Sequence, residues 1–521
     1  MKLRELIRGL EYAWIYGKKS AEDWEVGGIS YDSRTAEKGD LFVCLTGDAN
    51  DGHRHIQEAC IQRGVKVLMV EKLMLDGRMI DFPEETVVLM VKDGREALAY
   101  VSAAYFGHPA EKLKVIGITG TKGKTTTACL IRGMLEAAGC RTGLIGTMGI
   151  QIGEKEIPIK NTTPQSFTIH KYFAKMVEEG CEYAVMEVSS QGIKQKRIQG
   201  IPFLVGVFTN FGEDHIGPGE HACMEEYRYC KSCLFRQCRM GIGNLDDIQW
   251  SYMFRRATCE KYGFSCHCEA VGGEAPGKEH VLRAEQIRFL TTEEGPETTF
   301  AVDGEEYTLH MPGLFNVYNA LAALQVMRCL GVKDPAVKEY LKTAQVKGRM
   351  ERILLKKKVV CYIDYAHNAM SLENVLNTLR IYSPRRILLV FGCGGNRAKS
   401  RRLEMGRTAA KLADFSIVTS DNPRFEEPEK IIEDILTGMK EACPFQKTDA
   451  PEPGACGAWH VVCDRAEAVA YAIKEAKPFD VVLIVGKGHE TYQEIRGIRY
   501  PMDDRGLVER AEQSAGENTL R

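Results

Sequence analysis

The stretch KLKVIGITGTKGKTTTACLIRGMLEAAG, Lys112 to Gly139, decides the fold, because an apolar strand runs through a glycine-rich turn into an amphipathic helix. Val115 to Thr119 is rich in β-formers, and apolar residues then recur at helical spacing up to Gly139. Backbone N–H groups at such a helix N-terminus attract phosphate. The second half of the P-loop pattern, GK[ST], is matched by Gly123, Lys124 and Thr125. The first glycine of the pattern is absent, because position 118 is an isoleucine. The alternative to a phosphate-binding loop is an ordinary glycine turn that connects a strand to a helix.

Each residue type in this turn has a task at a nucleotide. Gly120 and Gly123 allow backbone N–H groups to close on phosphate oxygens. Lys124 adds a positive charge, and Thr125 offers a hydroxyl to Mg²⁺. We therefore predict a loop that binds ATP and Mg²⁺, formed by Gly120, Thr121, Lys122, Gly123, Lys124, Thr125 and Thr126.

Length and composition limit the class of protein. A chain of 521 residues exceeds one typical core and predicts two to four domains. A net charge of −2 argues against nucleic acid as a partner. The N-terminus lacks the apolar run of a signal peptide, and no stretch approaches the ~20 apolar residues of a membrane span. We therefore expect a cytoplasmic protein without a membrane span, and a monomer.

The 18 cysteines are scattered over the chain rather than set in a short disulfide framework, so we expect reduced thiols. Cys230 and Cys233, like Cys266 and Cys268, approach zinc-ligand spacing, but no well-spaced second pair follows either. Structural zinc is therefore the weaker interpretation.

The pattern of strands and helices divides the chain into three stretches. Residues 1–110 predict a small α/β unit. Residues 111–345 alternate strands and helices, which predicts a mostly parallel sheet with ligands beyond the carboxyl ends of its strands. The pattern restarts in residues 346–521. The elements expected in the first stretch are strands at Asp40 to Leu45 and Val65 to Val70 and a helix at His55 to Gly64.

Polar residues that can bind metal follow two strands of the middle stretch. Glu187 ends one strand, and Asp214 and His215 follow the next. Carboxylates suit Mg²⁺, and one imidazole is tolerable beside ATP phosphates. Because both strands come after the phosphate loop, we predict a metal site rather than isolated structural residues.

Two later helices carry further candidates. Lys231 lies in the helical run MEEYRYCKSCLF, where a lysine is ordinarily a solvated surface residue. Asn316 and Asn319 fall at the start of another helix, where an asparagine amide can cap the helix or contact a base edge.

Four strands of the last stretch each end in a polar cluster. They are KVVCYIDYA, RRILLVFGCGG, DFSIVTSDNPR and FDVVLIVGKGHE. Such endings are typical of the ligand-facing edge of an open α/β sheet, so we predict a second binding site. Residues 443–459 are expected to form an exposed loop.

Twelve motifs in this order resemble the Mur ligase family, and within it the ligases that add the third residue of the peptidoglycan stem peptide. The motifs are DSRTAEKGDLFVCLTG, GITGTKGKTTT, NTTPQSF, MEVSSQGIKQKR, FTNFGEDH, YCKSCLF, GLFNVYNALAA, GRMER, DYAHN, GGNR, DNPR and GKGHE. The resemblance covers essentially the whole chain. It implies three α/β domains: a UDP-sugar-binding domain (1–110), a P-loop-type ATPase with a mostly parallel sheet (111–345) and a Rossmann-like amino-acid-binding domain (346–521).

The resemblance also implies the ligand sets, motif by motif. The uridine end of the UDP-muramoyl dipeptide would contact Ser33 and Arg34, and its diphosphate-muramoyl peptide would contact Asn161, Thr162, Thr163, Ser189, Gln195 and Arg197. The adenosine of ATP would contact Asn319 and, more loosely, Asp364 and His367. The Mg²⁺ ligands would be Thr125, Glu187, His215 and a carbamate on Lys231. The amino acid, a diamino acid, would contact Arg397, Asp421, Asn422, Pro423, Arg424, Gly486 and Glu490.

The implied reaction is ATP-dependent amide formation through an acyl phosphate. A carboxylate does not accept an amine at neutral pH because oxide is a poor leaving group, and phosphorylation supplies a better one. Lys124, Lys231 and His215 are the expected catalytic residues. Carbamylation would turn the Lys231 cation into an oxygen-bearing anion that can bind Mg²⁺.

Arg424 bears on which amino acid is used. It stands in DNPR, where the family members that add diaminopimelate carry an arginine. A guanidinium can pair the carboxylate that distinguishes meso-diaminopimelate from L-lysine. Arg397 and Glu490 would complete a clamp on the same zwitterionic end. We therefore expect diaminopimelate.

Several positions depart from the family pattern, and three alternatives stay open. Lys122 replaces an asparagine, Gln191 a histidine and Asn396 an aspartate, while the segments after His215 and within 368–370 are also changed. A paralogue acting on a related acyl carrier is one alternative. A folylpolyglutamate-synthetase-like ligase shares the ATPase core but leaves DNPR and GKGHE unexplained. A regulatory nucleotide-binding module would release phosphate independently of an amino acid.

Replacing Lys124 tests the phosphate loop. We expect Lys124→Ala to lower turnover by orders of magnitude, because the lysine stabilises charge that moves during phosphoryl transfer. The fold should stay intact, since a loop lysine contributes little to stability. Steady-state phosphate release and a thermal melt measure the two effects, and unchanged turnover would contradict the assignment.

Overall fold

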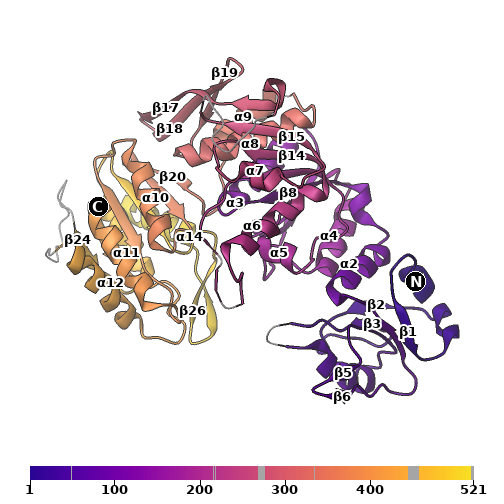
Figure 1. The fold of residues 1–521 in the computed structure, drawn as a ribbon. Helices are drawn as coiled ribbons and strands as arrows, with labels where there is room; N and C mark the ends of the chain where they lie inside the picture. Colours follow the sequence, from indigo (N-terminus) through magenta and orange to yellow (C-terminus); the bar gives the residue numbers. More distant parts are fainter. Residues whose placement is uncertain are drawn as a thin grey trace. The chain divides into compact units, whose positions relative to one another are not determined.

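The computed structural model describes residues 1–47, 50–214, 216–217, 219–267, 276–333, 335–443 and 457–517. Figure 1 shows the fold as a ribbon. The contacts between residues divide the chain into two compact units. The first unit comprises Met1–Arg283 and Tyr318–Val337, and the second comprises Ala284–Val317 and Lys338–Arg521. This division does not test the predicted domain boundaries at residues 110 and 345, which stay predictions.

A five-stranded sheet opens the first unit. Its order is β1-β7-β4-β3-β2, with β1 antiparallel to β7 and the other neighbours parallel. The strands are β1 (Ala13–Tyr16), β2 (Gly28–Ser30), β3 (Asp40–Val43), β4 (Val67–Val70) and β7 (Val87–Met90). A short hairpin, β5 (Met74–Leu75) and β6 (Arg78–Met79), lies between β4 and β7 in sequence.

Two apolar clusters cover the faces of this sheet. Helices α1 (Leu3–Leu6) and α2 (Gly94–Tyr105) contribute to one of them. The other contains Ile56, Ala59 and Cys60. The helix expected at His55 to Gly64 is instead a 3₁₀ turn, Gly52–His55, followed by a π-helical turn, Glu58–Gln62. The two strands expected in this region are confirmed as β3 and β4.

A nine-stranded sheet forms the centre of the first unit. Its order is β11-β10-β9-β12-β8-β13-β14-β15-β16, and all pairs from β9 to β16 are parallel. The strands are β8 (Lys114–Thr119), β9 (Thr142–Gly146), β10 (Gly149–Ile152), β11 (Lys155–Ile157), β12 (Tyr183–Glu187), β13 (Phe203–Phe208), β14 (Cys238–Asn244), β15 (Glu260–Ser265) and β16 (Val281–Arg283). The prediction of a mostly parallel sheet is confirmed.

Strand β8 lies between β12 and β13, which follow it in sequence, so the chain direction across the sheet reverses at β8. Ligands of open α/β sheets bind beyond the carboxyl ends of strands at such a point. The predicted phosphate loop begins there, at Gly120.

Helices pack on both faces of the central sheet. Helices α4 (Ser166–Glu178) and α7 (Trp250–Phe254) join one large apolar cluster. Helix α3 (Lys124–Ala137) contacts β8, β9 and β12, and its buried residues lie outside that cluster. The remaining helices in this stretch are α5 (Ser190–Lys194) and α6 (Met224–Ser232), while α8 (Leu314–Cys329) and α9 (Pro335–Thr343) include residues of both units.

The second unit contains an antiparallel three-stranded sheet, β17 (Glu285–Thr292), β18 (Gly295–Val302) and β19 (Glu305–Leu309). It also contains a six-stranded sheet of order β20-β21-β25-β22-β23-β24, in which β20 is antiparallel and the other strands are parallel. These strands are β20 (Glu351–Leu355), β21 (Val359–Asp364), β22 (Ile387–Phe391), β23 (Phe415–Val418), β24 (Ala458–Val461) and β25 (Val481–Val485).

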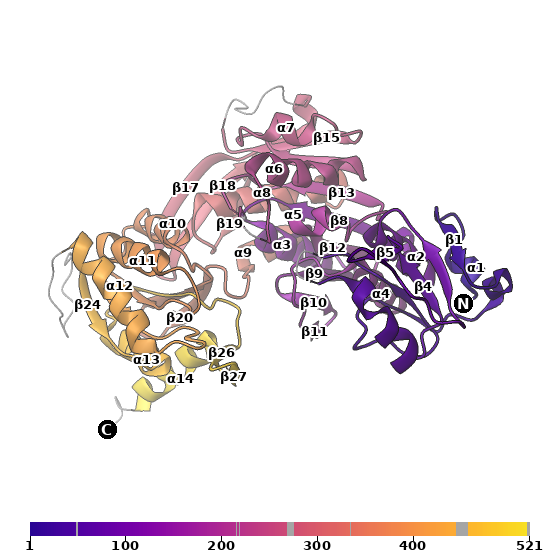
Figure 2. The ribbon, with the colours of Figure 1, turned by 60° about the horizontal axis from the view of Figure 1, so that its bottom comes forward.

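Helices cover both faces of the six-stranded sheet (Figure 2), and an apolar core lies on each face. One face is covered by α10 (Ala369–Arg380), α11 (Lys399–Leu412) and α12 (Pro428–Ala442). The other is covered by α13 (Arg465–Glu475) and α14 (Asp504–Glu517). A hairpin of β26 (Tyr492–Ile495) and β27 (Ile498–Pro501) follows β25.

The carboxyl ends of β21, β22, β23 and β25 meet at one edge of the second sheet, because these strands are parallel. The polar clusters predicted from the sequence therefore lie along one edge. Most of the segment 443–459 lies outside the described residues. Within the described ranges, no helix combines the length and apolarity needed to cross a membrane.

Candidate active site

The phosphate loop connects β8 to α3 with two glycines in unusual backbone conformations. Gly120 has φ +154° and Gly123, the N-cap of α3, has φ +82°. A β-carbon at position 120 would collide with the Thr209 side chain, and one at position 123 would lie 2.5 Å from Asn319 Oδ1. Because these close approaches leave no room for a side chain, glycine is required at both positions.

Lys124 folds back over its own loop. Its Nζ donates to the Gly120 carbonyl at 2.9 Å and to the Thr121 carbonyl at 3.1 Å. Lys122 is exposed and forms a 3.1 Å ion pair with Asp214. Thr125 and Thr126 are buried at the start of α3. The loop therefore carries two cations close to its backbone N–H groups, an arrangement suited to polyphosphate.

Asn210, which lies in the motif FTNFGEDH but was assigned no role from the sequence, fixes the shape of this loop. Its Oδ1 accepts from the Lys122 N–H at 2.9 Å, and its Nδ2 donates to the Lys122 carbonyl at 3.1 Å. The Asn210 carbonyl accepts from the Thr121 N–H at 2.9 Å. Its position just beyond β13, the strand beside β8, was the signal that could have identified it.

Glu187 ends β12 on the other side of β8 and is only 2% exposed. Its carboxylate accepts from Thr125 Oγ1 at 3.0 Å, from the Thr147 N–H at 2.7 Å and from Thr147 Oγ1 at 3.3 Å. A buried carboxylate beside a hydroxyl gives oxygen ligands of the hard type that Mg²⁺ prefers. The described residues therefore fit half of the predicted metal site, whereas His215 lies outside them.

Lys231 is buried under the phosphate loop, in contrast to the ordinary solvated lysine of a surface helix. Its side chain is about 1% exposed, and Nζ donates to the Gly120 carbonyl at 2.7 Å. The ring of Tyr227, one helical turn earlier, lies 4.4 Å from Nζ. Burial holds the pKa of Lys231 well below the ordinary value of a lysine, and the charge of Lys124 lowers it further against an opposing effect of Asp214. Lys231 is therefore suited to exist as an uncharged amine.

The residues predicted to hold the muramoyl peptide adjoin Glu187. Thr163 Oγ1 donates to the Glu187 carbonyl at 2.8 Å and accepts from the Ser189 N–H at 2.9 Å. The hydroxyls of Thr162 and Thr147 are 3.1 Å apart. Ser189 caps α5, and Asn161 is exposed. The structure thus brings most of this set to the end of β12, beside the candidate metal ligands.

Arg197 connects to the same group from the segment after α5. Its NH1 donates to the Thr163 carbonyl at 2.6 Å, and its NH2 to Gln195 Oε1 at 2.5 Å. Burial lowers the pKa of the guanidinium, and Arg95 lowers it further. Its Nε is buried without a hydrogen-bond partner among the described residues. A buried donor of this kind is suited to an anionic ligand.

Ser33 and Arg34, predicted to meet the uridine end, follow β2. Ser33 is buried and donates to Glu58 at 2.8 Å. Arg34 is largely exposed, and its guanidinium contacts the Asp32 carboxylate at 2.6 and 2.8 Å. Both side chains are held by neighbouring carboxylates of the five-stranded-sheet region.

The second unit brings together residues from DNPR and GKGHE. Asn422 Nδ2 donates to Glu490 Oε2 at 2.8 Å. Gly486 has φ +110°, and a β-carbon there would collide with the Asp421 carboxylate. Asp421 and Asn422 are buried. Four of the predicted amino-acid-binding residues therefore lie together beyond β23 and β25.

The Arg424 side chain contacts the Gly395 carbonyl and the Glu494 carboxylate. Its NH1 donates to the Gly395 carbonyl at 2.8 Å, and its Nε lies 3.7 Å from Glu494. Its φ of +54° is rare for a side chain of this size. Pro423, the preceding residue, packs its carbonyl against Gly395, where a β-carbon would collide with it. Arg397 is exposed on the GGNR loop.

Asp364 and His367 follow β21. The buried Asp364 carboxylate accepts from the backbone N–H groups of Met350 at 2.9 Å and Ala366 at 2.8 Å, and burial raises its pKa against an opposing effect of Arg349. His367 is exposed, with Nδ1 2.9 Å from the Tyr365 carbonyl. In the first unit, Asn319 Oδ1 accepts from Thr127 Oγ1 at 3.2 Å. The contacts of these residues with adenosine stay predictions.

Comparison with known proteins accounts for nearly the whole chain. Three family models match it: "Mur ligase family, catalytic domain" at residues 25–106, "Mur ligase middle domain" at 118–327 and "Mur ligase, glutamate ligase domain" at 348–488. A UDP-N-acetylmuramoyl-L-alanyl-D-glutamate–2,6-diaminopimelate ligase of Clostridium perfringens is 38% identical over 98% of this chain and 99% of its own. The chain belongs to the Mur ligase family.

Other members show the same relationship. A relative with the same name from Chlorobaculum tepidum is 37% identical over 93% of this chain and 92% of its own. A solved structure of a ligase with this name superposes with a TM-score of 0.68 and 25% identity, covering 99% of both chains. The predicted three-domain α/β fold of a Mur ligase is therefore confirmed. As a member of this family, the chain is an ATP-dependent ligase.

The positions that depart from the Mur ligase pattern have structural consequences. Lys122 gains its ion pair with Asp214, and Asn368 caps α10 by accepting from the Ser371 N–H at 2.9 Å. Asn396 has φ +54°, a conformation that asparagine tolerates. The Nε2 of Gln191 is buried with no hydrogen-bond partner among the described residues. None of these changes removes a candidate ligand.

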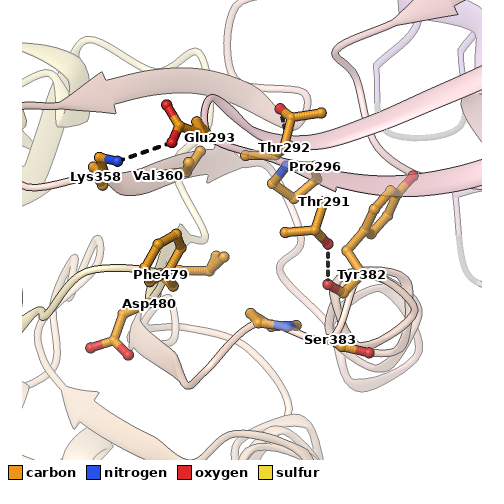
Figure 3. A pocket seen from close by; sticks show the side chains of 13 residues that line it. Thr291, Thr292, Glu293, Pro296, Lys358, Val360, Tyr382, Ser383, Phe479 and Asp480 are labelled. Carbon is orange, nitrogen blue, oxygen red and sulfur yellow. Dashed lines mark hydrogen bonds and ion pairs between the residues drawn. The ribbon is translucent and has the colours of Figure 1, made fainter.

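A small cavity of about 50 Å³ lies in the second unit of this Mur ligase (Figure 3). Pro296, Val360 and Phe479 line it, and Lys358 and Glu293 form an ion pair of 3.2 Å at its margin. None of the predicted site residues lines it. A space of this size accommodates a water molecule or two rather than a nucleotide or an amino acid.

Proposed function

We propose that the chain joins 2,6-diaminopimelate to UDP-N-acetylmuramoyl-L-alanyl-D-glutamate with hydrolysis of ATP, in peptidoglycan precursor synthesis. The observation that carries this proposal is the match of almost the entire chain, at 38% identity, to a relative with that printed name. A nucleotide-linked precursor and ATP are consistent with the cytoplasm. We also propose that residues 1–110, 111–345 and 346–521 are the three domains, and that the chain acts as a monomer.

The chemistry requires activation of the terminal carboxylate of the muramoyl dipeptide. That carboxylate attacks the γ-phosphorus of ATP, the bond between γ-phosphorus and the bridging oxygen breaks, and ADP leaves. The acyl phosphate then accepts the amine of diaminopimelate, and inorganic phosphate departs with the C–O bond electrons. The amine loses a proton as the amide forms.

The phosphate loop supplies positive charge for the first step. Lys124, poised over Gly120 and Thr121, exchanges its two backbone carbonyls for phosphate oxygens when ATP binds. Thr125, Glu187, His215 and a carbamate on Lys231 would hold Mg²⁺, which would neutralise charge on the phosphate oxygens. Asn210 keeps the loop backbone in the conformation that receives phosphate.

Lys231 acts as a carbamate in this proposal. Its uncharged amine attacks carbon dioxide, a C–N bond forms, and one proton is released to solvent. The resulting anion offers two oxygens in place of a cation. The support for this step is the nearly complete burial of Lys231 beside the phosphate loop and the lowered pKa that follows from it.

The acceptor is held next to the same loop. Thr162 and Thr163 lie beside Glu187, so a dipeptide bound to them has its carboxylate near the candidate metal ligands. Arg197 contributes a buried positive charge for the diphosphate or the peptide carboxylates. Ser33 and Arg34 are proposed to contact the uridine end.

Diaminopimelate is assigned to the cluster beyond β23 and β25. Arg424 offers a guanidinium whose orientation is set by the NH1 hydrogen bond to the Gly395 carbonyl and by the nearby Glu494 carboxylate. A guanidinium can pair a carboxylate through two parallel hydrogen bonds. Glu490 and Asn422 offer an acceptor and a donor beside it. L-Lysine lacks the second carboxylate and would leave Arg424 without this contact to the substrate.

Phosphate release with purified substrates tests the function. We expect release from ATP to require both the UDP-muramoyl dipeptide and diaminopimelate, with amide product formed in equal amount. Release without an amino acid would favour a regulatory nucleotide-binding module. Activity with a folate acceptor in place of the muramoyl dipeptide would favour the folylpolyglutamate-synthetase-like alternative.

Replacing Lys231 tests the carbamate. We expect Lys231→Ala to lower turnover by orders of magnitude, because the anion is missing, and short carboxylates such as formate to restore part of it. A ¹³C carbamate resonance after incubation with labelled bicarbonate should be present in the wild type and absent from the variant. Lys175→Ala, at a lysine exposed on α4, is the control. Wild-type turnover of Lys231→Ala at low Mg²⁺ would contradict the metal-site assignment.

Replacing Arg424 tests the choice of amino acid. We expect the wild type to prefer diaminopimelate over L-lysine by roughly 10⁴ in kcat/KM, and Arg424→Ala to lose most of that preference. Arg496→Ala, at an exposed arginine in the hairpin turn that contacts Arg424 through the backbone, should retain it. Equal use of lysine by the wild type, or an unchanged preference in Arg424→Ala, would remove Arg424 from this role.

A further inference from the structure

Lys487, the lysine of GKGHE, is a fully buried cation among the residues assigned to diaminopimelate. Its side chain is 0% exposed, and it lies two residues beyond the end of β25. Neither the motif analysis nor the proposed reaction gives it a role. A buried ammonium is costly unless it is paired and hydrogen-bonded, so its contacts indicate why it is there.

The backbone around Lys487 is built to turn this side chain inward. Gly486 has φ +110° and Gly488 has φ +53°. A β-carbon at position 486 would collide with the Asp421 carboxylate, and one at position 488 would lie 2.9 Å from the Gly348 carbonyl. Two glycines therefore flank the lysine because their neighbours leave no space for side chains.

Lys487 contacts two of the proposed amino-acid-binding residues at once. Its Nζ donates to Asn422 Oδ1 at 2.9 Å and lies 3.4 Å from Glu490 Oε2. Asn422 Nδ2 donates to the same Glu490 oxygen at 2.8 Å. The three side chains thus form a closed triangle of hydrogen bonds.

This triangle fixes how the other two side chains are oriented. An ammonium group donates and never accepts, so the Asn422 amide must turn its oxygen toward Lys487. The Glu494 N–H also donates to that oxygen, at 2.9 Å, and requires the same orientation. The amide nitrogen of Asn422 therefore points to Glu490. In a flipped amide, the NH₂ group would face the Lys487 ammonium and the Glu494 N–H, which are also donors.

One oxygen of Glu490 is left for a ligand. Oε2 is engaged by both Lys487 and Asn422, whereas Oε1 accepts no hydrogen bond from any part of the chain that the structure describes. An ionised carboxylate oxygen only accepts, so the group it selects is a donor with positive charge. The ammonium of an amino acid fits this requirement.

The charges around Lys487 are balanced by neighbouring groups. Burial lowers its pKa, while the carboxylates of Asp421 and Glu490 oppose that shift. Arg465, the other buried cation nearby, forms its own ion pair with Asp504 at 2.8 Å. Lys487 is therefore the cation that holds the Glu490–Asn422 pair.

We propose that Lys487 is a positioning residue that sets specificity for the diamino acid, by holding Glu490 so that its Oε1 accepts the substrate's distal ammonium. This inference rests on the proposed function. Lys487 does not touch substrate in this arrangement and acts through Glu490. A lysine needed only to fill space could be replaced by methionine without effect on substrate choice.

Steady-state kinetics of Lys487→Met test the role. We expect KM for diaminopimelate to rise about 10- to 100-fold, because the held carboxylate is released, and kcat at saturation to change less than about 3-fold. KM for ATP and for the UDP-muramoyl dipeptide should be unchanged. Lys358→Met, which removes a half-exposed lysine of the same unit, is the matched control and should leave all three values unchanged.

A substrate analogue separates positioning from general damage. 2-Aminopimelate keeps the attacking amine and both carboxylates but lacks the distal ammonium. The wild type should use it with a kcat/KM about 10- to 100-fold below that for diaminopimelate. Lys487→Met should use the two compounds about equally, because the contact that distinguishes them is already lost. Glu490→Gln should behave in the same way, and the double variant should be no worse than either single variant.

The outcomes separate the two proposals. If the wild type ligates diaminopimelate but Lys487→Met keeps its KM and its preference over 2-aminopimelate, the role of Lys487 is wrong and the function stands. Equal loss of activity toward both compounds, with a lowered melting temperature, would show a structural role and also overturn the inference. If the wild type ligates no diamino acid, the function and the inference fail together.

Discussion

The parallel pairing of β12, β8 and β13 is the constraint on which the chemistry of the first unit depends. Glu187 pairs with Ile118, and Phe208 with Thr119, so three strand ends reach the same edge. The phosphate loop then leaves from the middle strand, with a carboxylate on one side and Asn210 on the other. The pairing of these strands thus places Glu187, Asn210 and the phosphate loop close together, although they are far apart in sequence. Lys231, on helix α6, contacts the same loop through a hydrogen bond to the Gly120 carbonyl.

The second unit applies the same constraint to a different ligand. Strands β21, β25, β22 and β23 are parallel, so their loops share an edge. Here the glycine-rich loop between β22 and α11 lacks the GK[ST] sequence found at the start of α3, and the edge instead carries Arg424 and Glu490. A sheet edge lined with a fixed guanidinium and a fixed carboxylate is suited to a zwitterion rather than to a polyphosphate. The two edges therefore differ in chemistry, although they arise from the same strand pairing.

The sequence was sufficient to predict the role of residues that belong to a recognisable local pattern. It was not sufficient for residues whose role depends on a partner that is distant in the sequence and close in the fold. The phosphate loop, Glu187 and the four polar strand ends followed from local patterns. Asn210 and Lys487 stand in the motifs FTNFGEDH and GKGHE, but their roles did not follow from the sequence, because each acts through a residue 88 or 65 positions away. The burial of Lys231 did not follow from its helix, since an amphipathic helix with one lysine predicts a solvated side chain; only the family resemblance gave this lysine a role in the site. The segment expected to be a helix at His55 to Gly64 is helical over most of its length, but it ends as a π-helical turn, which its apolar spacing does not show.

Two buried lysines illustrate how the same residue type acquires different chemistry. Both are almost wholly shielded from water, and burial lowers the pKa of each. Lys231 donates its hydrogen bond to a neutral carbonyl and lies near the Lys124 cation, so its environment favours loss of the proton and a nucleophilic amine. Lys487 lies beside the carboxylates of Glu490 and Asp421, which oppose loss of the proton and favour a fixed cation. The nature of the nearest acceptor, rather than burial alone, therefore separates a lysine suited to covalent modification from one suited to orienting its neighbours.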